Sequence, residues 1–374
     1  MKLKMMGKRK VLILQEEMPE YRVPIFNMLA DKVDLTVAFF RPIKLENKIH
    51  FNTVTLKSHQ LGRYFYLPGL RNFCKGYDVV YYAPHLKVFN FFLLTFYNNK
   101  FKTVAWTNGT RASYTQMFDL NRRMGFLDKL YFMNIRRADA IILYIKEALE
   151  TVTRNGVDKK RVFVAHNTVV VNYEESPESD RNTILFVGTL YKGKGVDELI
   201  KCYREAYRGQ DESIIPSLEI VGKGAELKSL ENSVEELGLS GKVKFHGGIY
   251  DEGILAKIFR RSILCISPNQ AGLSVLKSLG YGVPFVTKRN AITGGEIVNV
   301  LDKYNGILYQ EADDLTALLK DLIIDKSKYI QMGKNAREYY LTQASPERMV
   351  GGFLDALNFV TAEVASKELT ETMV

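Results

Sequence analysis

Cysteine is scarce in this sequence, and its few cysteines are poorly placed for any shared chemistry. Cys74, Cys202 and Cys265 are far apart, odd in number and form no Cys-x-x-Cys motif. This spacing supports neither a disulfide framework nor a thiolate metal site, and it fits a reducing, cytoplasmic setting.

Long hydrophobic runs are also absent. The longest apolar run, FNFFLLTFY, is far shorter than the ~20 residues that a helix needs to span a bilayer. The basic start MKLKMMGKRK is followed only by VLIL, which is too short for the core of a signal peptide. We therefore expect a cytoplasmic protein that is soluble or rests on the inner face of a membrane.

Motifs for metals and for nucleic acids are missing as well. The sequence has no Asp-x-Asp motif and no cluster of histidines and carboxylates with the spacing of metal ligands. Basic residues are spread along the chain without a nucleic-acid recognition motif. The net charge of +10 and the pI near 9.2 instead suggest a phosphorylated ligand or an anionic membrane surface.

What the sequence has throughout is an alternation of short β-rich runs with helical patterns, which is typical of parallel sheets with crossover helices. The first half contains KVLILQ, VDLTVAFF, YDVVYYAP, KTVAWTN, ADAIILYI and RVFVAHN. A polar, acidic stretch at 172–182 is interpreted as a linker. The rhythm then restarts with TILFVG, SLEIVG, KVKFHG, SILCISP, PFVT and GILY.

This pattern predicts an α/β protein with two Rossmann-like, doubly wound domains, over residues 1–175 and 176–345, that face a central cleft. Residues 346–374 are expected to form an amphipathic helix that returns to the first domain. Its expected core residues share one face: Met349, Phe353, Leu354, Leu357 and Val360.

The segment SPNQAGLSVLKSLGYGVPFVT, residues 267–287, places a glycine-containing turn between a strand and a helix. The first turn of a helix carries unpaired N–H groups and a partial positive charge, so it favours an anion. One helix face is apolar and suited to packing: Val275, Leu276 and Leu279. The other face is predicted to look into the cleft: Ser274, Lys277, Ser278 and Tyr281. From this segment alone, a joint without any ligand is an equally good interpretation.

Two further loops of the second half have the same form. FVGTLYKGKGVDELI has Gly188 directly after a strand and Lys194 just before a helix, and EIVGKGAELKSL has Gly222 and Gly224 between strand and helix. With KFHG at 244–247 and Gly-x-Pro at 282–284, these segments resemble the carboxyl-terminal domain of GT-B glycosyltransferases, specifically the retaining family 4 (glycosyl transferases group 1). The resemblance is strong over residues 183–309 and weaker in the first half.

The resemblance implies a donor site for a nucleoside diphosphate sugar, without a cofactor or a metal. The backbone amides of Gly272, Leu273 and Ser274 would hold the diphosphate, and Lys194 would neutralise the leaving phosphates. His246 stands where the family binds the nucleotide base. The other donor-binding residues that it implies lie in the same loops: Gly188, Thr189, Lys192, Gly222, Lys223, Gln270 and Ala271.

The sequence departs from the family's pattern at the donor site. The family usually has a Glu-x7-Glu motif, and the matching positions here are Asn269 and Lys277. An asparagine can still hydrogen-bond the donor sugar, but a lysine cannot accept from ribose hydroxyls, so Lys277 either meets a phosphate or is solvated. Thr189 replaces an arginine that is usual after the first glycine, and Lys192 is a candidate for the missing charge.

The first half is expected to hold the acceptor. EEMPEYRVPIFNML resembles the first strand–helix loop of such enzymes, with Glu17, Tyr21 and Arg22 as acceptor-binding residues, although an ordinary surface charge explains Arg22 nearly as well. AWTNGTRASY follows the fourth predicted strand and adds Arg111. It also places Asn108 where related sequences often carry a histidine, which leaves no obvious proton carrier there. Lys194, Asn269 and Asn108 are the predicted catalytic residues.

Taken together, the sequence predicts a retaining, hexosyltransferase-like enzyme that moves a sugar from a nucleoside diphosphate sugar to a glycan or lipid-linked acceptor. A role in bacterial surface polysaccharide synthesis, such as lipopolysaccharide or capsule, is expected from the resemblance. The mixed basic and aromatic stretches 62–77 and 121–137 suit contact with an anionic membrane, or ordinary helix packing. A sugar-nucleotide epimerase of the same architecture and a catalytically silent nucleotide-binding partner subunit remain the alternatives.

Overall fold

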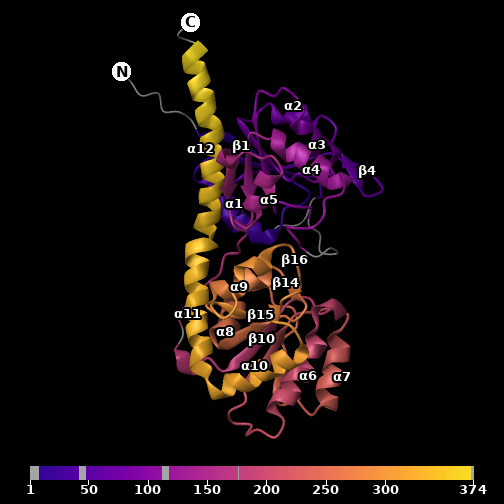
Figure 1. The fold of residues 1–374 in the computed structure, drawn as a ribbon, viewed down its shortest axis with the longest axis vertical. Helices are drawn as coiled ribbons and strands as arrows, with labels where there is room; N and C mark the ends of the chain where they lie inside the picture. The colour runs from indigo at the N-terminus through magenta and orange to yellow at the C-terminus, as the bar shows by residue number, and fades with distance from the viewer. Residues whose placement is uncertain (1–7, 42–47, 112–117, 176, 372–374) are drawn as a thin grey trace. The chain divides into compact units, whose positions relative to one another are not determined.

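The chain folds into two compact α/β units (Figure 1). The computed structural model describes residues 8–41, 48–111, 118–175 and 177–371, with side chains up to residue 362. Unit 1 comprises the chain up to Arg111, Asp119–Asn167 and the carboxyl-terminal helix from Pro346, and unit 2 contains Thr168–Ser345. Among the described residues, no helix combines the length and the apolar character needed to cross a bilayer.

Unit 1 is built on a parallel sheet. Its strands lie in the order β3 (Asn52–Thr55), β2 (Asp34–Phe39), β1 (Lys10–Gln15), β6 (Val79–Tyr82), β7 (Lys102–Thr107), β8 (Ala140–Leu143) and β9 (Val162–Val164). The inner strands are buried along almost their whole length, as expected for a parallel sheet with both faces covered. A separate antiparallel hairpin consists of β4 (His59–Leu61) and β5 (Tyr64–Tyr66).

The helices of unit 1 connect these strands. They are η1 (Glu20–Arg22), α1 (Val23–Ala30), α2 (Leu70–Cys74), α3 (Phe89–Leu94), α4 (Phe126–Arg137), α5 (Ala148–Arg154), η2 (Lys159–Arg161) and α12 (Pro346–Glu371). The last of them, α12, packs against α1 and the strands β7, β8 and β9. The backbone carbonyl of Phe353 accepts a hydrogen bond from the hydroxyl of Tyr81 at 2.8 Å. The ring of Phe353 packs edge-on against the ring of Trp106. The expected apolar face of this helix lies in the core of unit 1.

Unit 2 is built on a second parallel sheet. Its strands lie in the order β12 (Val243–Phe245), β11 (Ser217–Val221), β10 (Thr183–Val187), β13 (Ser262–Ile266), β15 (Phe285–Lys288) and β17 (Gly306–Tyr309). Two very short strands, β14 (Gln270–Ala271) and β16 (Ile292–Thr293), pair separately. The helical segments are η3 (Glu178–Asp180), η4 (Lys192–Lys194), α6 (Val196–Tyr207), α7 (Leu227–Glu236), α8 (Glu252–Arg260), α9 (Leu273–Gly280), η5 (Glu296–Asn299), α10 (Ala312–Ile324) and α11 (Lys326–Gln343).

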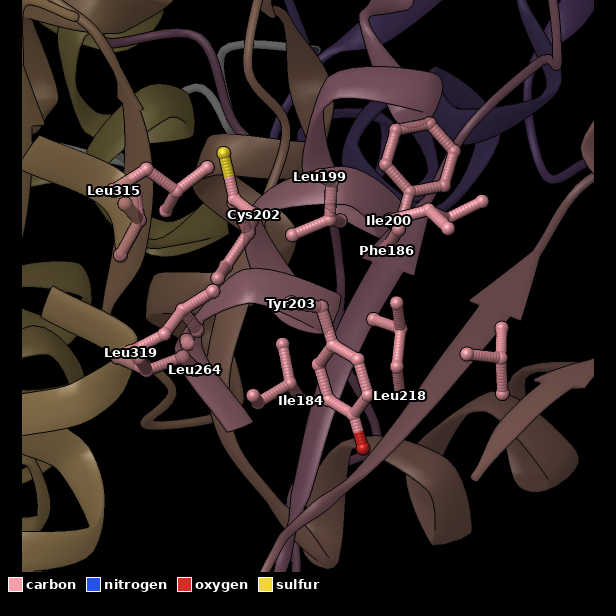
Figure 2. Close-up of a cluster of buried hydrophobic side chains, with 14 of the residues drawn as sticks. Ile184, Phe186, Leu199, Ile200, Cys202, Tyr203, Leu218, Leu264, Leu315 and Leu319 are labelled. Atoms are coloured by element: carbon pink, nitrogen blue, oxygen red, sulfur yellow. The ribbon is translucent and has the colours of Figure 1, made fainter. Parts of the chain in front are cut away.

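The core of unit 2 forms where α6 and α10 cover one face of this sheet (Figure 2). Alternate residues of β10, such as Ile184 and Phe186, point to that face because side chains alternate along a strand. Leu199 and Tyr203 of α6 and Leu319 of α10 meet them there. The hydroxyl of Tyr203, which would otherwise be a buried polar group without a partner, donates to the carbonyl of Pro216 at 2.7 Å.

The boundary between the units lies earlier than the expected linker. We expected the second domain to begin at residue 176, but the contacts assign residues from Thr168 onward to unit 2. The reason is local: Thr168 donates a hydrogen bond to the carbonyl of Ala344, and Tyr340 donates to the carbonyl of Val169 at 2.6 Å. The polar stretch that reads as a linker therefore follows the first contacts of unit 2.

Substitutions at two adjacent glycines of α12 can test how tightly this helix packs against the rest of unit 1. A Cβ on Gly352 would lie 2.3 Å from the carbonyl oxygen of Val164, whereas a Cβ on Gly351 would meet no atom within 4 Å. We expect Gly352→Ala to lower the free energy of unfolding by about 1–3 kcal/mol through overpacking. The matched control Gly351→Ala is expected to raise it by about 0.5–1 kcal/mol, because alanine suits a helix better than glycine. Urea unfolding of both variants measures the difference, and equal stabilities would contradict the packing.

Candidate active site

The carboxyl ends of β10 and β13 lie side by side at the point where the strand order of unit 2 reverses. β10 has β11 on one side and β13 on the other, so crossover connections leave it in both directions. Open α/β sheets bind ligands in the crevice outside such a switch point. The chain leaving β10 passes Gly188 and forms η4, and the chain leaving β13 leads into α9. The candidate donor site is therefore built from these two connections.

Lys194, at the end of η4, presents its ammonium group at this edge. A Cβ on Gly188 would lie 3.4 Å from Lys194 Nζ, so the ammonium rests against the backbone just after β10. Burial lowers the pKa of Lys194. None of the ion pairs formed by the described residues includes it. A half-buried ammonium without a carboxylate partner is suited to an anionic ligand.

Asn269 is held against the same turn. Its backbone N–H donates to the carbonyl of Lys194 at 3.3 Å. A Cβ on Gly195 would lie only 2.6 Å from Asn269 Nδ2, and Gly195 has a φ of 71°, which glycine adopts without strain. The structure thus brings together Lys194 and Asn269, two of the three predicted catalytic residues. The third, Asn108, lies in unit 1 directly after β7.

The amino end of α9 is a candidate site for an anion. Gly272 is the N-cap, and the N–H groups of the first turn, including those of Leu273 and Ser274, have no preceding helical carbonyl. A Cβ on Gly272 would meet no atom within 4 Å, so there is open space on that side of the N-cap residue. Unpaired N–H groups with open space in front of them form the geometry that binds phosphate oxygens at helix ends.

The two glycines after β11 are required by close packing between loops and not by a ligand. A Cβ on Gly222 would lie 1.9 Å from the carbonyl oxygen of Gly188, and one on Gly224 would lie 2.1 Å from that of Leu190. The two connections are held this close by backbone hydrogen bonds, such as the one from Leu190 N to the carbonyl of Lys223 at 3.0 Å. Loop packing alone therefore requires both glycines. Three predicted donor residues remain exposed on these loops: Thr189, Lys192 and Lys223.

Gln270 and Ala271 do not form part of a simple turn. They are the short strand β14, which pairs with β16. Ala271 is completely buried, which leaves none of its atoms available to a ligand, so we correct its assignment as a donor contact. The side-chain carbonyl of Gln270 accepts a hydrogen bond from the hydroxyl of Tyr191. Tyr191 was missed by the sequence analysis, although it is the aromatic residue within the first glycine-rich loop.

The predicted polar face of α9 is mostly covered, which corrects the helical-wheel expectation. Ser278 is buried and donates to the carbonyl of Val283 at 2.7 Å. Tyr281 is also buried, and its ring stacks on Phe259 with centroids 4.6 Å apart. The wheel failed here because α9 has packing partners on more than one side, including α11.

Lys277 is not simply solvated, because it forms an ion pair with Glu252 at the start of α8. The second carboxylate oxygen of Glu252 accepts from Tyr281 at 3.1 Å. Glu252 was also missed, and its distance of 25 positions in the chain left no local signal for the pair. The positively charged residue that stands where the family has a glutamate is thus matched by a glutamate from a neighbouring helix.

His246 is not directed into open space, as a base-binding residue would be. Its Nε2 lies 3.3 Å from a carboxylate oxygen of buried Glu219. Both oxygens of that carboxylate accept hydrogen bonds from Arg261, so Glu219 is already paired with an arginine. A contact of His246 with a nucleotide base therefore stays a prediction, which would have to use the imidazole beside this carboxylate.

In unit 1, Arg22 is the predicted acceptor residue with the most distinctive surroundings. Its guanidinium lies over the ring of Trp106 at 4.4 Å and donates to Gln15 Oε1 at 3.2 Å and to the Tyr144 hydroxyl at 2.8 Å. Burial lowers its pKa, but Tyr144 and Tyr21 outweigh this effect, so the pKa lies above its usual value. Arg22 is therefore not the ordinary surface charge that the sequence also allowed.

The other predicted acceptor residues differ from one another. Tyr21 lies next to Arg22, with its ring centre 5.4 Å from the guanidinium, and Glu17 is exposed. Arg111 instead pairs with the buried carboxylate of Asp128 at 3.5 Å, together with Arg122. These contacts hold the start of α4, so Arg111 has a structural partner, and its acceptor role stays a prediction.

His85 is a residue of this edge that the sequence analysis did not single out. It follows β6, the neighbour of β1, and its pKa is lowered by desolvation, although part of its side chain reaches solvent. Lys87 and Arg22 lower that pKa further, and Glu16 raises it. The signal that would have found it is its place, because the carboxyl ends of β1 and β6 meet at the switch point of unit 1.

Comparison with known proteins identifies unit 2. Residues 172–339 match the family model described as Glycosyl transferases group 1. A Haemophilus influenzae protein described as an uncharacterized glycosyltransferase is 24% identical over 253 residues, which cover 66% of this chain and 67% of that protein. The GDP-mannose-dependent alpha-(1-6)-phosphatidylinositol monomannoside mannosyltransferase of Mycolicibacterium smegmatis is 29% identical over 197 residues, 50% of each chain. Apart from the first relative, the alignments span only about half of the curated proteins' length.

Solved structures share the fold. HepE of Anabaena, solved with UDP and glucose, has a TM-score of 0.68 at 15% identity, over 94% of this chain and 99% of that one. WaaG, described as a glycosyltransferase involved in lipopolysaccharide biosynthesis, has a TM-score of 0.60 at 16% identity, over 94% and 99%. At such identities the likeness concerns the fold alone. The two parallel-sheet units form the predicted GT-B fold, and the family resemblance is confirmed.

The Lys277–Glu252 pair can be tested by reversing it. Lys277→Glu places two carboxylates together, and Glu252→Lys places two ammonium groups together. Because the pair is partly exposed, we expect each single variant to lower the free energy of unfolding by about 1 kcal/mol or less. The double variant, with both charges exchanged, should regain most of this loss, and high salt should weaken the coupling. Urea unfolding of the four proteins measures it, and strictly additive effects would show that the pair contributes nothing.

Proposed function

We propose that this chain, whose residues 172–339 match the family model of the glycosyl transferases group 1, is a retaining glycosyltransferase that uses a nucleoside diphosphate sugar. The observation that carries the proposal is the ammonium of Lys194, which has no carboxylate partner, at the same sheet edge as the open amino end of α9. A diphosphate has charge on both phosphates, and these two positive groups can share it. Unit 2 binds the donor, and unit 1 binds the acceptor.

The chemistry that this site supports is stabilisation of the leaving group. When the bond from sugar to phosphate breaks, negative charge grows on the diphosphate, and positive groups already in place lower the barrier most. Lys194 and the first turn of α9 supply them in place of a divalent ion, so the proposed transfer is metal-independent. Asn269, held against Gly195, is the polar side chain available to hydrogen-bond the sugar.

The retaining course is proposed from the family resemblance, and the residues of the site bear on how retention would be achieved. A double displacement needs a carboxylate nucleophile beside the sugar, and the family's first glutamate position holds the amide Asn269, which cannot act as one. In a front-face displacement the leaving phosphate itself accepts the proton of the acceptor hydroxyl, and no protein base is needed. A mechanism without a protein base also agrees with the presence of Asn108 at a position where related sequences often have a histidine.

We further propose that the acceptor is a glycan or lipid-linked molecule of a bacterial surface polysaccharide, handled in the cytoplasm. The support is the fold shared with WaaG and the phosphatidylinositol-linked substrate in the name of the mycobacterial relative. The nucleotide is proposed to be a uracil or guanine nucleotide, since HepE was solved with UDP and the mycobacterial relative is GDP-mannose-dependent.

An epimerase of the same architecture is less well supported. Such an enzyme needs carboxylates and a histidine for proton transfer beside the sugar. In unit 2, His246 is engaged with Glu219, and Glu252 is engaged with Lys277. A silent nucleotide-binding subunit would keep the binding site without turnover, so measured transfer distinguishes it from an enzyme.

Diphosphate binding tests the donor site directly. UDP, GDP, ADP and dTDP are each added to the full chain, and unfolding is followed by heat. We expect one of them to stabilise the protein, by about 2.7 kcal/mol at 100 times its dissociation constant. Lys194→Ala should weaken this binding by roughly 1.5–3 kcal/mol, because it removes a charged contact to phosphate.

The matched control is Lys201→Ala, which removes an exposed lysine from α6, where it pairs only with Asp197. Nucleotide binding and sugar transfer should be unchanged in this variant. If no nucleoside diphosphate stabilises the wild type, or if Lys194→Ala binds as tightly as Lys201→Ala, the proposed donor site is wrong.

Peripheral contact with an anionic membrane is proposed for the hairpin of β4 and β5. Leu61, at its turn, is 84% exposed, and Tyr64 and Tyr66 are also largely exposed, with the basic Arg63 between them. Next to the hairpin, residues that include Tyr66 and Arg71 line a cavity of about 220 Å³. Apolar and aromatic side chains beside basic ones are suited to the boundary between acyl chains and anionic headgroups.

Leu61→Glu tests this contact. We expect the variant to bind phosphatidylglycerol vesicles roughly tenfold more weakly than the wild type, because a buried leucine contributes about 1.5–3 kcal/mol. Ile324→Glu is the matched control, since Ile324 is 81% exposed but lies at the end of α10 in unit 2. Co-sedimentation with phosphatidylglycerol and phosphatidylcholine vesicles measures both. Equal binding of the two variants, or no preference for the anionic lipid, would reject the hairpin as the contact.

A further inference from the structure

A cation without an anionic partner lies at the switch point of unit 1. The sheet order reverses at β1, which has β2 on one side and β6 on the other. Arg22 is the last residue of η1, on the connection that leaves β1, and it bonds to Gln15 at the end of that strand. The crevice outside such a reversal is the usual ligand position of an open α/β sheet.

The guanidinium of Arg22 is surrounded by neutral groups. Its hydrogen-bond acceptors are the amide oxygen of Gln15 and the hydroxyl of Tyr144, and its faces meet the rings of Trp106, Tyr21 and Tyr144. Its Nε–H is buried and has no hydrogen-bond partner. None of the ion pairs that the described residues form includes Arg22.

The surroundings of Arg22 make its burial costly in free energy unless a further group supplies a counter-ion. A buried charge without a counter-ion and a buried N–H without an acceptor each cost free energy. The aromatic rings compensate part of the charge through cation–π contacts, but they offer no good acceptor to Nε–H. An oxyanion would supply the missing charge, and the planar guanidinium fork matches its geometry.

The charges nearby do not replace such an anion. Glu16, the acidic residue directly after β1, already forms an ion pair with Arg41 at 2.9 Å. On the other side of the switch point, the residues that follow β6 include His85 and Lys87, and Lys87 adds a further positive charge. The same connection also contains Glu17 and Glu20, so the case for an anion rests on the immediate surroundings of the Arg22 guanidinium and not on the net charge nearby.

We propose that Arg22 forms an anion-binding subsite that receives a phosphate group of the acceptor. This deepens the proposed function and rests on it for the word acceptor, but the binding of phosphate itself does not. The phosphate has two possible sources, a soluble sugar phosphate or a lipid headgroup, and both present the same tetrahedral oxyanion. Trp106 holds the guanidinium from one face, and Gln15 and Tyr144 fix its orientation, so Arg22 is positioned before the ligand arrives.

The protein contains its own probe for this subsite. Trp106 is the only tryptophan of the chain and lies 4.4 Å from the Arg22 guanidinium, so its fluorescence should change when the subsite fills. Inorganic phosphate, glucose 1-phosphate and glucuronate are titrated into the full-length wild type and into Lys194→Ala. The second protein serves to exclude phosphate bound at the donor site. Calorimetry of the same titrations gives affinities that do not depend on fluorescence.

We expect saturable binding of inorganic phosphate and of glucose 1-phosphate in both proteins. Arg22→Gln should weaken it roughly tenfold or more, because it removes a charged hydrogen-bonding partner. Arg22→Lys, which keeps the charge but loses the fork, should bind with intermediate affinity and guards against a merely unfolded Arg22→Gln. Arg154→Gln removes an exposed arginine of unit 1 that pairs with Glu150, and it should bind phosphate as the wild type does.

The source of the phosphate is decided by competition. If vesicles with phosphatidic acid displace glucose 1-phosphate and phosphatidylcholine vesicles do not, the lipid headgroup is the source; if neither does, the soluble phosphate is. A wild type without saturable phosphate binding, an Arg22→Gln variant with unchanged affinity, or binding of glucuronate alone would each overturn the proposal. UDP stabilisation is measured in the same variants, so the loss of either site is seen without the other.

Discussion

Parallel pairing of β10 with strands on both of its sides is the constraint on which the candidate donor site depends. Because β11 and β13 run parallel to β10, all three connections leave from one edge of the sheet. There they come so close that the carbonyl of Gly188 occupies the place where any side chain at residue 222 would begin. This contact sets the course of the loop that leads to Lys194, and the start of α9 follows from β13 at the same edge.

Positively charged side chains that contact a carboxylate differ from those that do not, and this difference distinguishes structural residues from candidate site residues. Lys277, Arg111 and Arg261 each contact a carboxylate, and each of these contacts joins segments that the fold must hold together. Lys194 and Arg22 have no such partner within the part of the chain that the structure describes, and both lie at the carboxyl edge of a parallel sheet. A positive group kept partly buried without a counter-ion reduces stability, so its retention is best explained by an anionic ligand.

The comparisons with known proteins say more about unit 2 than about unit 1. Unit 2 contains the whole segment that matches a family model. Unit 1 shares its fold with solved structures at a level of identity that says nothing of its ligands. What unit 1 binds is therefore inferred from its own side chains, above all from the aromatic and amide groups around Arg22. A shared fold does not by itself identify a ligand.

The sequence by itself determined the two parallel sheets and the loops of the donor site, because these depend on features close together in the chain. Apolar runs such as KVLILQ predict buried strands, and a glycine followed by a helix marks the connection after them. Strands without such a run, including β3 with its mostly exposed residues, were not predicted. Nor was β14, which is two residues long and exists only because β16 lies beside it. The tertiary structure alone decided which charges meet. Lys277 and Glu252, or Arg22 and Tyr144, are far apart in the chain and come together only when strands and helices are packed, so no local pattern records them.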